Sequence, residues 1–199
     1  DIRDGPSSQS SPLAVALIIL FEHSPILLKT LEPQLSAYLK SQPLSALPSY
    51  IHLINISLEK IRKWDIASQS EFISGHPRIG ESKNLSTLSA SEQGAIATVN
   101  PTPPEVLARL KHLNACYEAQ YPGLRYITFV NGRSRALIAE EMEDVLGIKH
   151  SLLPDAPVVV RFEAGAYSRS DVKWLNELKR AVEDVGKIAK SRLKALGVD

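Results

Sequence analysis

The feature of this sequence that most constrains its fold is the spacing of its apolar residues, which recur every three or four positions over long segments. The longest such stripe follows Ser170 and reaches about Leu196. Its members are Trp174, Leu178, Val182, Val185, Ile188 and Leu193. This spacing puts the side chains on one face of an α-helix, and Ser170 can cap its start. The pattern predicts a long amphipathic helix that packs against a core.

Prolines, glycines and capping residues divide the rest of the chain into further predicted helices. Residues 13–21 are an apolar run, shorter than the roughly 20 residues that cross a bilayer, and predict a buried helix. Ser24 and Pro25 can begin a second helix. The remaining predicted helices cover residues 48–64, 65–74, 89–100, 103–121 and 134–146. Ser89 and Glu92 have the spacing of a capping box, which predicts that Ser89 caps its helix.

Two segments interrupt this helical pattern. Residues 126–130 are β-branched and aromatic, which predicts one short strand or extended segment. Residues 157–162 also favour a strand or an extended arm. The predicted fold class is therefore all-α, a single-domain helical bundle with at most a short extended element. Polar residues 1–12 are expected to form a flexible leader, and 13–199 the domain.

The charge balance and the cysteine content exclude several classes of function. The formal net charge is +1, from 23 basic and 22 acidic side chains, so neither nucleic acid nor a membrane is expected as the main partner. The single cysteine, Cys116, cannot form an intramolecular disulfide and is predicted to be a buried core residue. The histidines show no metal-ligand spacing with cysteines or carboxylates, so no metal site is predicted.

Chemistry-bearing side chains gather in one stretch between two predicted helices. It reads Gly75-His76-Pro77-Arg78-Ile79-Gly80-Glu81 and is followed by Leu88-Ser89-Ala90-Ser91-Glu92-Gln93. A loop of this kind on a rigid scaffold is a usual place for a binding or catalytic site. His76 suits proton transfer, because a histidine near its reference pKa of about 6.5 can act as base or acid at neutral pH.

These motifs, taken in order, resemble the 2-oxo-4-hydroxy-4-carboxy-5-ureidoimidazoline (OHCU) decarboxylases, which form allantoin in urate degradation. The family carries a His-Pro-x-hydrophobic-Gly loop and then Ser-x-x-Glu-Gln, as this chain does at residues 76–80 and 89–93. Four further motifs fit the family: Phe21-Glu22-His23-Ser24-Pro25, Leu113-Asn114 with Tyr117, the segment 126–133, and the motif of the last predicted helix, which contains Glu177, Ala181, Ile188 and Arg192-Leu193. The resemblance covers most of residues 13–196.

The resemblance implies a small-molecule substrate, decarboxylation without a metal or organic cofactor, and a homodimer. It implies His76 and Glu92 as catalytic residues. The implied substrate-binding residues are Pro77, Ser89, Gln93, Ile127, Asn131 and Arg133. Ser89 and Glu92 have helix capping as an alternative role, and Arg133 a solvated surface charge. A peroxisomal or cytoplasmic protein is expected rather than a secreted one, because residues 1–22 lack the features of a signal peptide.

The chain also departs from the family pattern at two places. Asn131 occupies a position where many members have an arginine, so Arg133 or another basic residue such as Arg78 is expected to bind the substrate carboxylate. Residues 147–169 are longer than the usual connection and are expected to be an insertion.

Two alternative functions remain: a silent ligand-binding protein of the same fold, or a decarboxylase of a related ureido-imidazoline.

Overall fold

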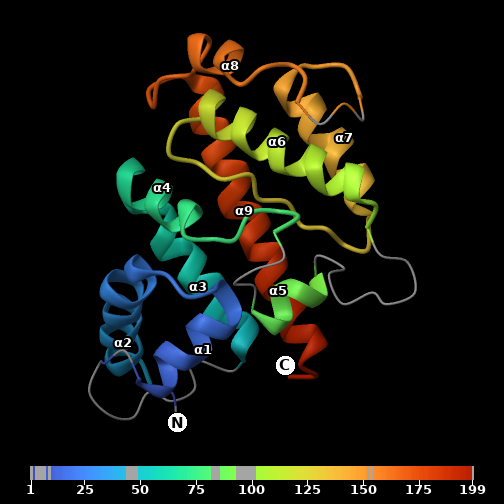
Figure 1. Ribbon diagram of the computed structural model, residues 1–199. Helices are drawn as coiled ribbons and strands as arrows, with labels where there is room; N and C mark the ends of the chain where they lie inside the picture. Colours follow the sequence, from blue (N-terminus) through green and yellow to red (C-terminus); the bar gives the residue numbers. More distant parts are fainter. Residues whose placement is uncertain are drawn as a thin grey trace. The chain divides into compact units, whose positions relative to one another are not determined.

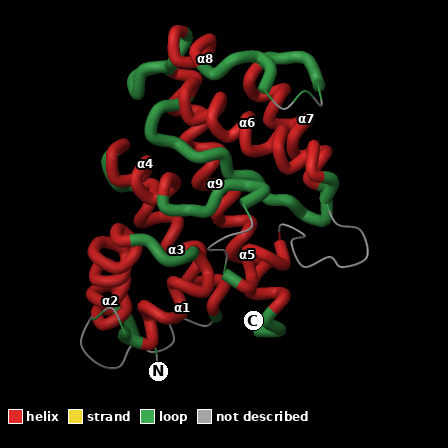
Figure 2. The backbone as a smooth tube through the Cα atoms, in the orientation of Figure 1, coloured by secondary structure: helices red, strands yellow, loops and turns green. Residues whose placement is uncertain are grey.

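The computed structural model describes residues 2, 8, 10–43, 49–81, 86–92, 102–151, 153 and 155–198. Within these residues the chain is helix or connecting loop, and no strand is present (Figure 2). The predicted all-α class is confirmed. Contacts divide the chain into two compact units, residues 1–76 with 178–199 and residues 77–177. The earlier prediction of a single domain stays a prediction, and each unit is described separately.

The first unit is built from the N-terminal helices and most of the last helix (Figure 1). Its elements are α1 (Pro12–Phe21), the π-helical turn η1 (Leu27–Leu31), α2 (Glu32–Ser41), α3 (Tyr50–Arg62), α4 (Ile66–Ser74) and the part of α9 (Val172–Ala195) from Leu178 onward. Side-chain oxygens of Ser11, Ser49 and Asp65 cap α1, α3 and α4. These caps explain where the helices begin, because each satisfies a backbone N–H that the helix leaves open.

The core of the first unit is aliphatic. α1 packs against η1 and α2, and α3 packs against both of these. Its fully buried side chains include Leu17, Leu27, Leu31, Leu35, Leu53, Ile54, Ile61 and Phe72. The expected stripe of α9 supplies Val182, Val185 and Leu193 to the buried residues. The C-terminal segment therefore completes a core that the N-terminal helices begin.

The second unit centres on α6. Its elements are α5 (Thr87–Glu92), α6 (Pro104–Gln120), α7 (Arg135–Leu146), α8 (Val160–Ala164) and the first turns of α9. α6 packs against α7 and α8, which lie beside it in Figure 1. Trp174 at the start of α9 is fully buried, and its indole N–H donates to the Pro122 carbonyl oxygen at 3.2 Å. The helices predicted over 103–121 and 134–146 are confirmed within a residue at each end.

A buried ion pair holds the long connection between α7 and α8. Arg109 on α6 donates from Nε to Glu143 Oε1 on α7 at 2.7 Å, and both side chains are almost fully buried. The Arg109 guanidinium also donates to the carbonyl oxygens of Leu153 and Ala156, and Glu143 accepts the Ser151 N–H at 3.1 Å. These bonds satisfy backbone groups of a segment without regular structure, which explains how it packs against α6.

Of the two segments predicted to be extended, one is a loop and the other contains the start of a helix. Residues 124–130 form a loop without strand pairing. Residues 157–162 were expected to be extended, but the helix α8 begins at Val160, so that prediction is wrong. Phe162 is buried there while Val160 is exposed, so tertiary packing has overridden the β-propensity of the valines.

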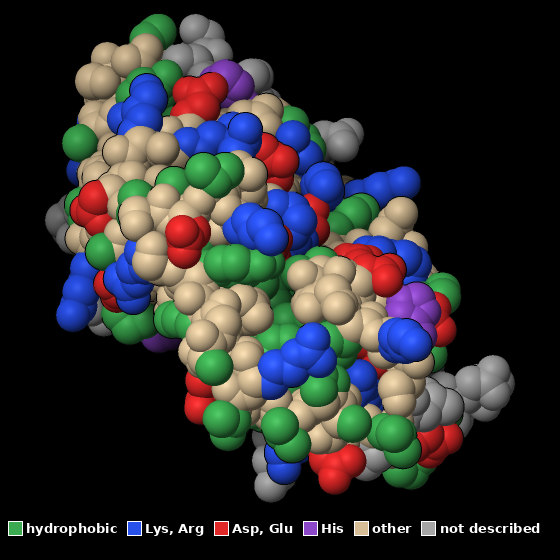
Figure 3. All heavy atoms as spheres, turned by 90° about the horizontal axis from the view of Figure 1, so that it is seen from above, with side chains coloured by type: hydrophobic (Ala, Val, Ile, Leu, Met, Phe, Trp, Pro, Cys, Tyr) green, Lys and Arg blue, Asp and Glu red, His purple; other side chains and the backbone are tan. Residues whose placement is uncertain are grey.

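No described helix has both the length and the apolar character needed to cross a membrane. On the face drawn in Figure 3, basic and acidic side chains are interspersed rather than gathered by sign. This distribution agrees with the near-neutral charge of the sequence.

Candidate functional site

His76 lies directly after α4, in a turn that fixes its ring. Gly75 ends α4, and the His76 N–H donates to the Ile73 carbonyl oxygen at 3.2 Å. The Nδ1 atom lies 2.9 Å from the Phe72 carbonyl oxygen, and the Phe72 ring packs edge-on at 5.0 Å between centroids. A carbonyl can only accept, so Nδ1 carries a proton. In the neutral ring, Nε2 then holds the lone pair that a general base needs.

The residues around His76 in the first unit come from a distant part of the sequence. A Cβ atom added at Gly75 would lie 2.8 Å from Ser24 Cβ, so only glycine fits this approach. The Phe21 ring contacts the Phe72 ring at 6.3 Å between centroids. The motif at residues 21–25 is thus brought against the turn that carries His76, and the 3% exposed Ser24 is part of that packing.

An ion pair between the buried Arg192 and the half-buried Glu22 adds the end of α9 to this part of the first unit. Arg192 is 3% exposed; it lies 2.7 Å from Glu22 Oε1 and donates to the Ile19 carbonyl oxygen at 3.2 Å. Glu22 has a φ of 65°, a conformation that is uncommon for a non-glycine residue. Glu22 and Arg192 belong to two of the sequence motifs, but the sequence predicts no site role for either residue. Their membership of these motifs is the sequence signal that could have indicated a role for them.

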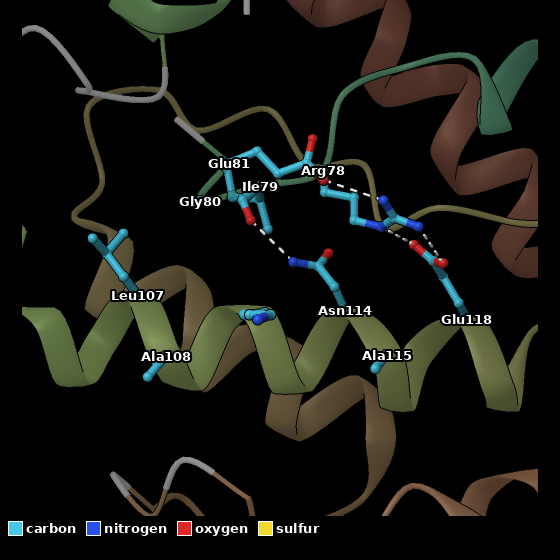
Figure 4. Close-up of a pocket in the computed structure, with 10 residues that line it drawn as sticks. Arg78, Ile79, Gly80, Glu81, Leu107, Ala108, Asn114, Ala115 and Glu118 are labelled. Carbon is cyan, nitrogen blue, oxygen red and sulfur yellow. Dashed lines mark hydrogen bonds and ion pairs between the residues drawn. The ribbon is translucent and has the colours of Figure 1, made fainter. Parts of the chain in front are cut away.

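In the second unit, the loop that follows Pro77 lies along α6 (Figure 4). Asn114 Nδ2 donates to the Ile79 carbonyl oxygen at 3.0 Å, and Gly80, with φ 83°, lies against the Leu110 side chain. Arg78 reaches Glu118 near the end of α6. Loop and helix enclose a groove of about 740 Å³ lined by Arg78, Ile79, Gly80, Glu81, Leu107, Ala108, Lys111, Asn114, Ala115 and Glu118.

The short helix α5 corrects the predicted capping box. The helix begins at Thr87, and Ser86 Oγ accepts the Ser89 N–H at 3.1 Å, so Ser86 acts as the cap and Ser89 lies inside the helix. Ser89 is buried. Glu92 is the last residue of α5, and its side chain lies outside the described part of the chain, as Gln93 does altogether. Substrate binding by these residues remains a prediction.

Arg133 takes part in a polar cluster rather than lying free in solvent. Its guanidinium pairs with Glu141 on α7 and donates to the Phe129 carbonyl oxygen at 2.6 Å and the Val130 carbonyl oxygen at 3.0 Å. Glu141 also accepts from Tyr126 and Thr128. Burial alone would raise the pKa of Glu141, but these hydrogen bonds and the Arg133 charge outweigh it and hold that pKa below its usual value.

Two other residues predicted to bind substrate, Ile127 and Asn131, lie in the segment just before Arg133. Ile127 is buried, whereas Asn131 is exposed in a turn with φ 47° that continues into Gly132. Pro77 is half-buried at the start of the second unit. His76 belongs to the first unit, and the other described site residues belong to the second.

Cys116 has surroundings that suppress a nucleophilic role. Its side chain is fully buried, and burial raises the pKa of the thiol to about 11 although the Arg109 charge opposes this. His112 Nε2 lies 3.3 Å from the sulfur, but the same nitrogen lies 2.8 Å from the Pro157 carbonyl oxygen and must donate to it. His112 therefore cannot accept the thiol proton, which agrees with the predicted core role.

Comparison with known proteins identifies a family. The family model described as OHCU decarboxylase matches residues 8–150, more than half of the chain. The matched residues include the motif at 21–25, the His76 turn, α5 and α6. No curated protein is significantly similar to the chain.

Proposed function

This chain belongs to the OHCU decarboxylase family, and from that premise we propose that it converts 2-oxo-4-hydroxy-4-carboxy-5-ureidoimidazoline to (S)-allantoin and carbon dioxide. The family assignment by itself supports decarboxylation in urate degradation. The observation that carries the finer proposal is the hydrogen bond from His76 Nδ1 to the Phe72 carbonyl oxygen, which leaves Nε2 as the basic nitrogen.

In the proposed reaction, Nε2 of His76 takes the proton of the substrate hydroxyl group. The bond between the ring carbon and the carboxylate breaks, carbon dioxide leaves, and the electron pair enters the conjugated ring. The proton held by His76 is then returned to one face of the ring, which sets the configuration of allantoin, and water supplies the second proton that the loss of carbon dioxide from the carboxylate anion requires. The substrate serves as its own electron sink, so the protein supplies orientation, charge stabilisation and proton transfer. Glu92 is proposed to orient the substrate through its ring and ureido N–H groups.

The substrate carboxylate needs a cationic partner, and we propose Arg192 for it. Arg78 and Arg133 belong to the second unit, where each pairs with a carboxylate. Arg192 belongs to the same unit as His76, and its partner Glu22 belongs to the motif packed against the His76 turn.

The experiment couples urate oxidation and hydroxyisourate hydrolysis to the purified protein and follows circular dichroism as allantoin forms. Spontaneous decay yields racemic allantoin, so an optical signal reports the catalysed reaction alone. We expect His76→Asn to lower kcat by about 10²–10⁴-fold, because the amide can still donate to Phe72 but provides no comparable base. His150→Asn, at an exposed histidine of the second unit, is the matched control and should keep full activity.

Two results would contradict parts of this proposal. If the wild-type protein forms allantoin only at the racemic background rate, the decarboxylase assignment fails, and binding of allantoin by an inactive protein becomes the explanation to test. If the wild-type protein is active and Arg192→Lys leaves KM unchanged, the substrate carboxylate has another partner.

A further inference from the structure

The loop that follows His76-Pro77 is attached to α6 by a two-point ion pair. Arg78 Nε lies 2.6 Å from Glu118 Oε1, and Arg78 Nη2 lies 2.8 Å from Glu118 Oε2. Both oxygens of one carboxylate thus meet two nitrogens of one guanidinium, the arrangement that fixes direction as well as distance (Figure 4). Glu81 accepts from the third nitrogen of Arg78 at 3.1 Å.

This ion pair joins parts of the chain that are far apart in sequence. Arg78 and Glu118 are separated by 40 positions, so the bond attaches the loop to α6 rather than closing a local turn. Asn114, one helical turn before Glu118, holds the same loop through the Ile79 carbonyl oxygen. The path of residues 78–80 is therefore fixed against one face of α6 from two neighbouring turns.

Because the ion pair is partly exposed, we expect it to affect the geometry of the loop more than the stability of the fold. The side chains of Arg78 and Glu118 are 37% and 29% exposed. Ion pairs at such positions contribute little to the free energy of unfolding, because water and salt screen them. Their geometry can still restrict the folded loop. Pro77 is the single residue between His76 and Arg78, so the position of Arg78 bears directly on the backbone that carries the imidazole.

We propose that Glu118 is a positioning residue for decarboxylation: by holding Arg78 it fixes the loop that leaves His76 and so keeps the imidazole in its reactive orientation. The inference rests on the proposed function. Glu118 acts through Arg78 and the backbone and makes no contact with substrate. A small error in the position of a catalytic group can lower the rate by about 10²-fold, so a partial loosening is expected to be visible in kcat.

The test compares Glu118→Gln with Glu105→Gln, the same substitution on the first turn of the same helix. For Glu118→Gln we expect kcat to fall about tenfold, with KM within about twofold of wild type and an unchanged urea midpoint. Hydrogen exchange of the peptide covering residues 77–81 should become faster. The exchanged pair Arg78→Glu with Glu118→Arg should recover much of the kcat that either single substitution loses.

Wild-type kcat in Glu118→Gln would overturn the inference, and so would a double variant whose losses simply add. A kcat loss matched by an equal loss of folded protein would also overturn it, because Glu118 would then be structural only. Failure of the proposed function is a separate result: it is seen as absence of enantioselective allantoin formation by the wild-type protein itself.

Discussion

A Cβ atom added at Gly75 would lie 2.8 Å from Ser24 Cβ, closer than two carbon atoms pack without a shift. We therefore expect Gly75→Ala to lower the free energy of unfolding by about 1–3 kcal/mol, as overpacking does, and to reduce kcat because His76 is the next residue. Urea unfolding and the allantoin assay measure the two effects.

Gly165→Ala is the control for this substitution, since its added atom would meet its nearest neighbour at 3.7 Å. Adding Ser24→Gly to Gly75→Ala removes the clashing atom and should restore part of the lost activity. An unchanged urea midpoint in Gly75→Ala alone would mean that the close approach is absent in solution.

The environment of Cys116 leads to a prediction about reactivity. Burial and a pKa of about 11 keep the thiol protonated and inaccessible at neutral pH. In the folded protein it should react with a disulfide reagent such as 5,5′-dithiobis(2-nitrobenzoate) far more slowly than in 6 M guanidinium chloride, by about 10³-fold or more if global unfolding is required. Rapid labelling of the folded protein at pH 7.5 would contradict this view.

At the scale of helices, the sequence predicted most elements because their ends carry local signals. Ser134 caps α7, and Gly147 ends it with a left-handed φ of 63°. Where the signal was ambiguous, the prediction failed: α5 has serines at both 86 and 89, and Ser86 is the cap. The valines near α8 favoured an extended arm, but the burial of Phe162 decided its conformation.

The candidate site could be predicted only in part, because contacts between residues far apart in the chain leave no local pattern in the sequence. The motifs identified His76, but sequence spacing cannot tell which carboxylate an arginine will meet. Substrate binding by Arg133 stays a prediction, and the pairing of its guanidinium with Glu141 is a contact that the sequence did not indicate. The Arg192–Glu22 pair joins residues 170 positions apart in the chain, a contact that no local pattern predicts.

The Glu141 cluster ties the loop 124–130 to α7 and gives the fold a pH dependence. The folded-state pKa of Glu141 lies below its ordinary value, so its contribution to stability is present above the unfolded pKa and is lost as the pH falls through the folded value. We expect the free energy of unfolding to fall below about pH 4.5, and less steeply in Glu141→Gln. Urea titrations between pH 3 and 7 measure both slopes, and identical slopes would exclude this role.

At the scale of the whole molecule, the first unit is discontinuous in sequence, because its core includes residues from 178 onward. A chain that ends after Glu177 would lose the buried side chains of Val182, Val185 and Leu193. We expect hydrogen-exchange protection to disappear over residues 50–74 and to persist over α6 and α7. Retained protection over residues 50–74 would show that the N-terminal helices pack without α9.

The discontinuity of the first unit has a consequence for biosynthesis. The second unit is one continuous segment, so its contacts can form while the ribosome is still adding residues. The N-terminal helices leave the ribosome earlier, but their apolar faces stay uncovered until the segment from Leu178 onward has been synthesised. Apolar faces that are uncovered during that interval favour aggregation. The second unit can therefore fold before the first unit, although the N-terminal helices are synthesised before it.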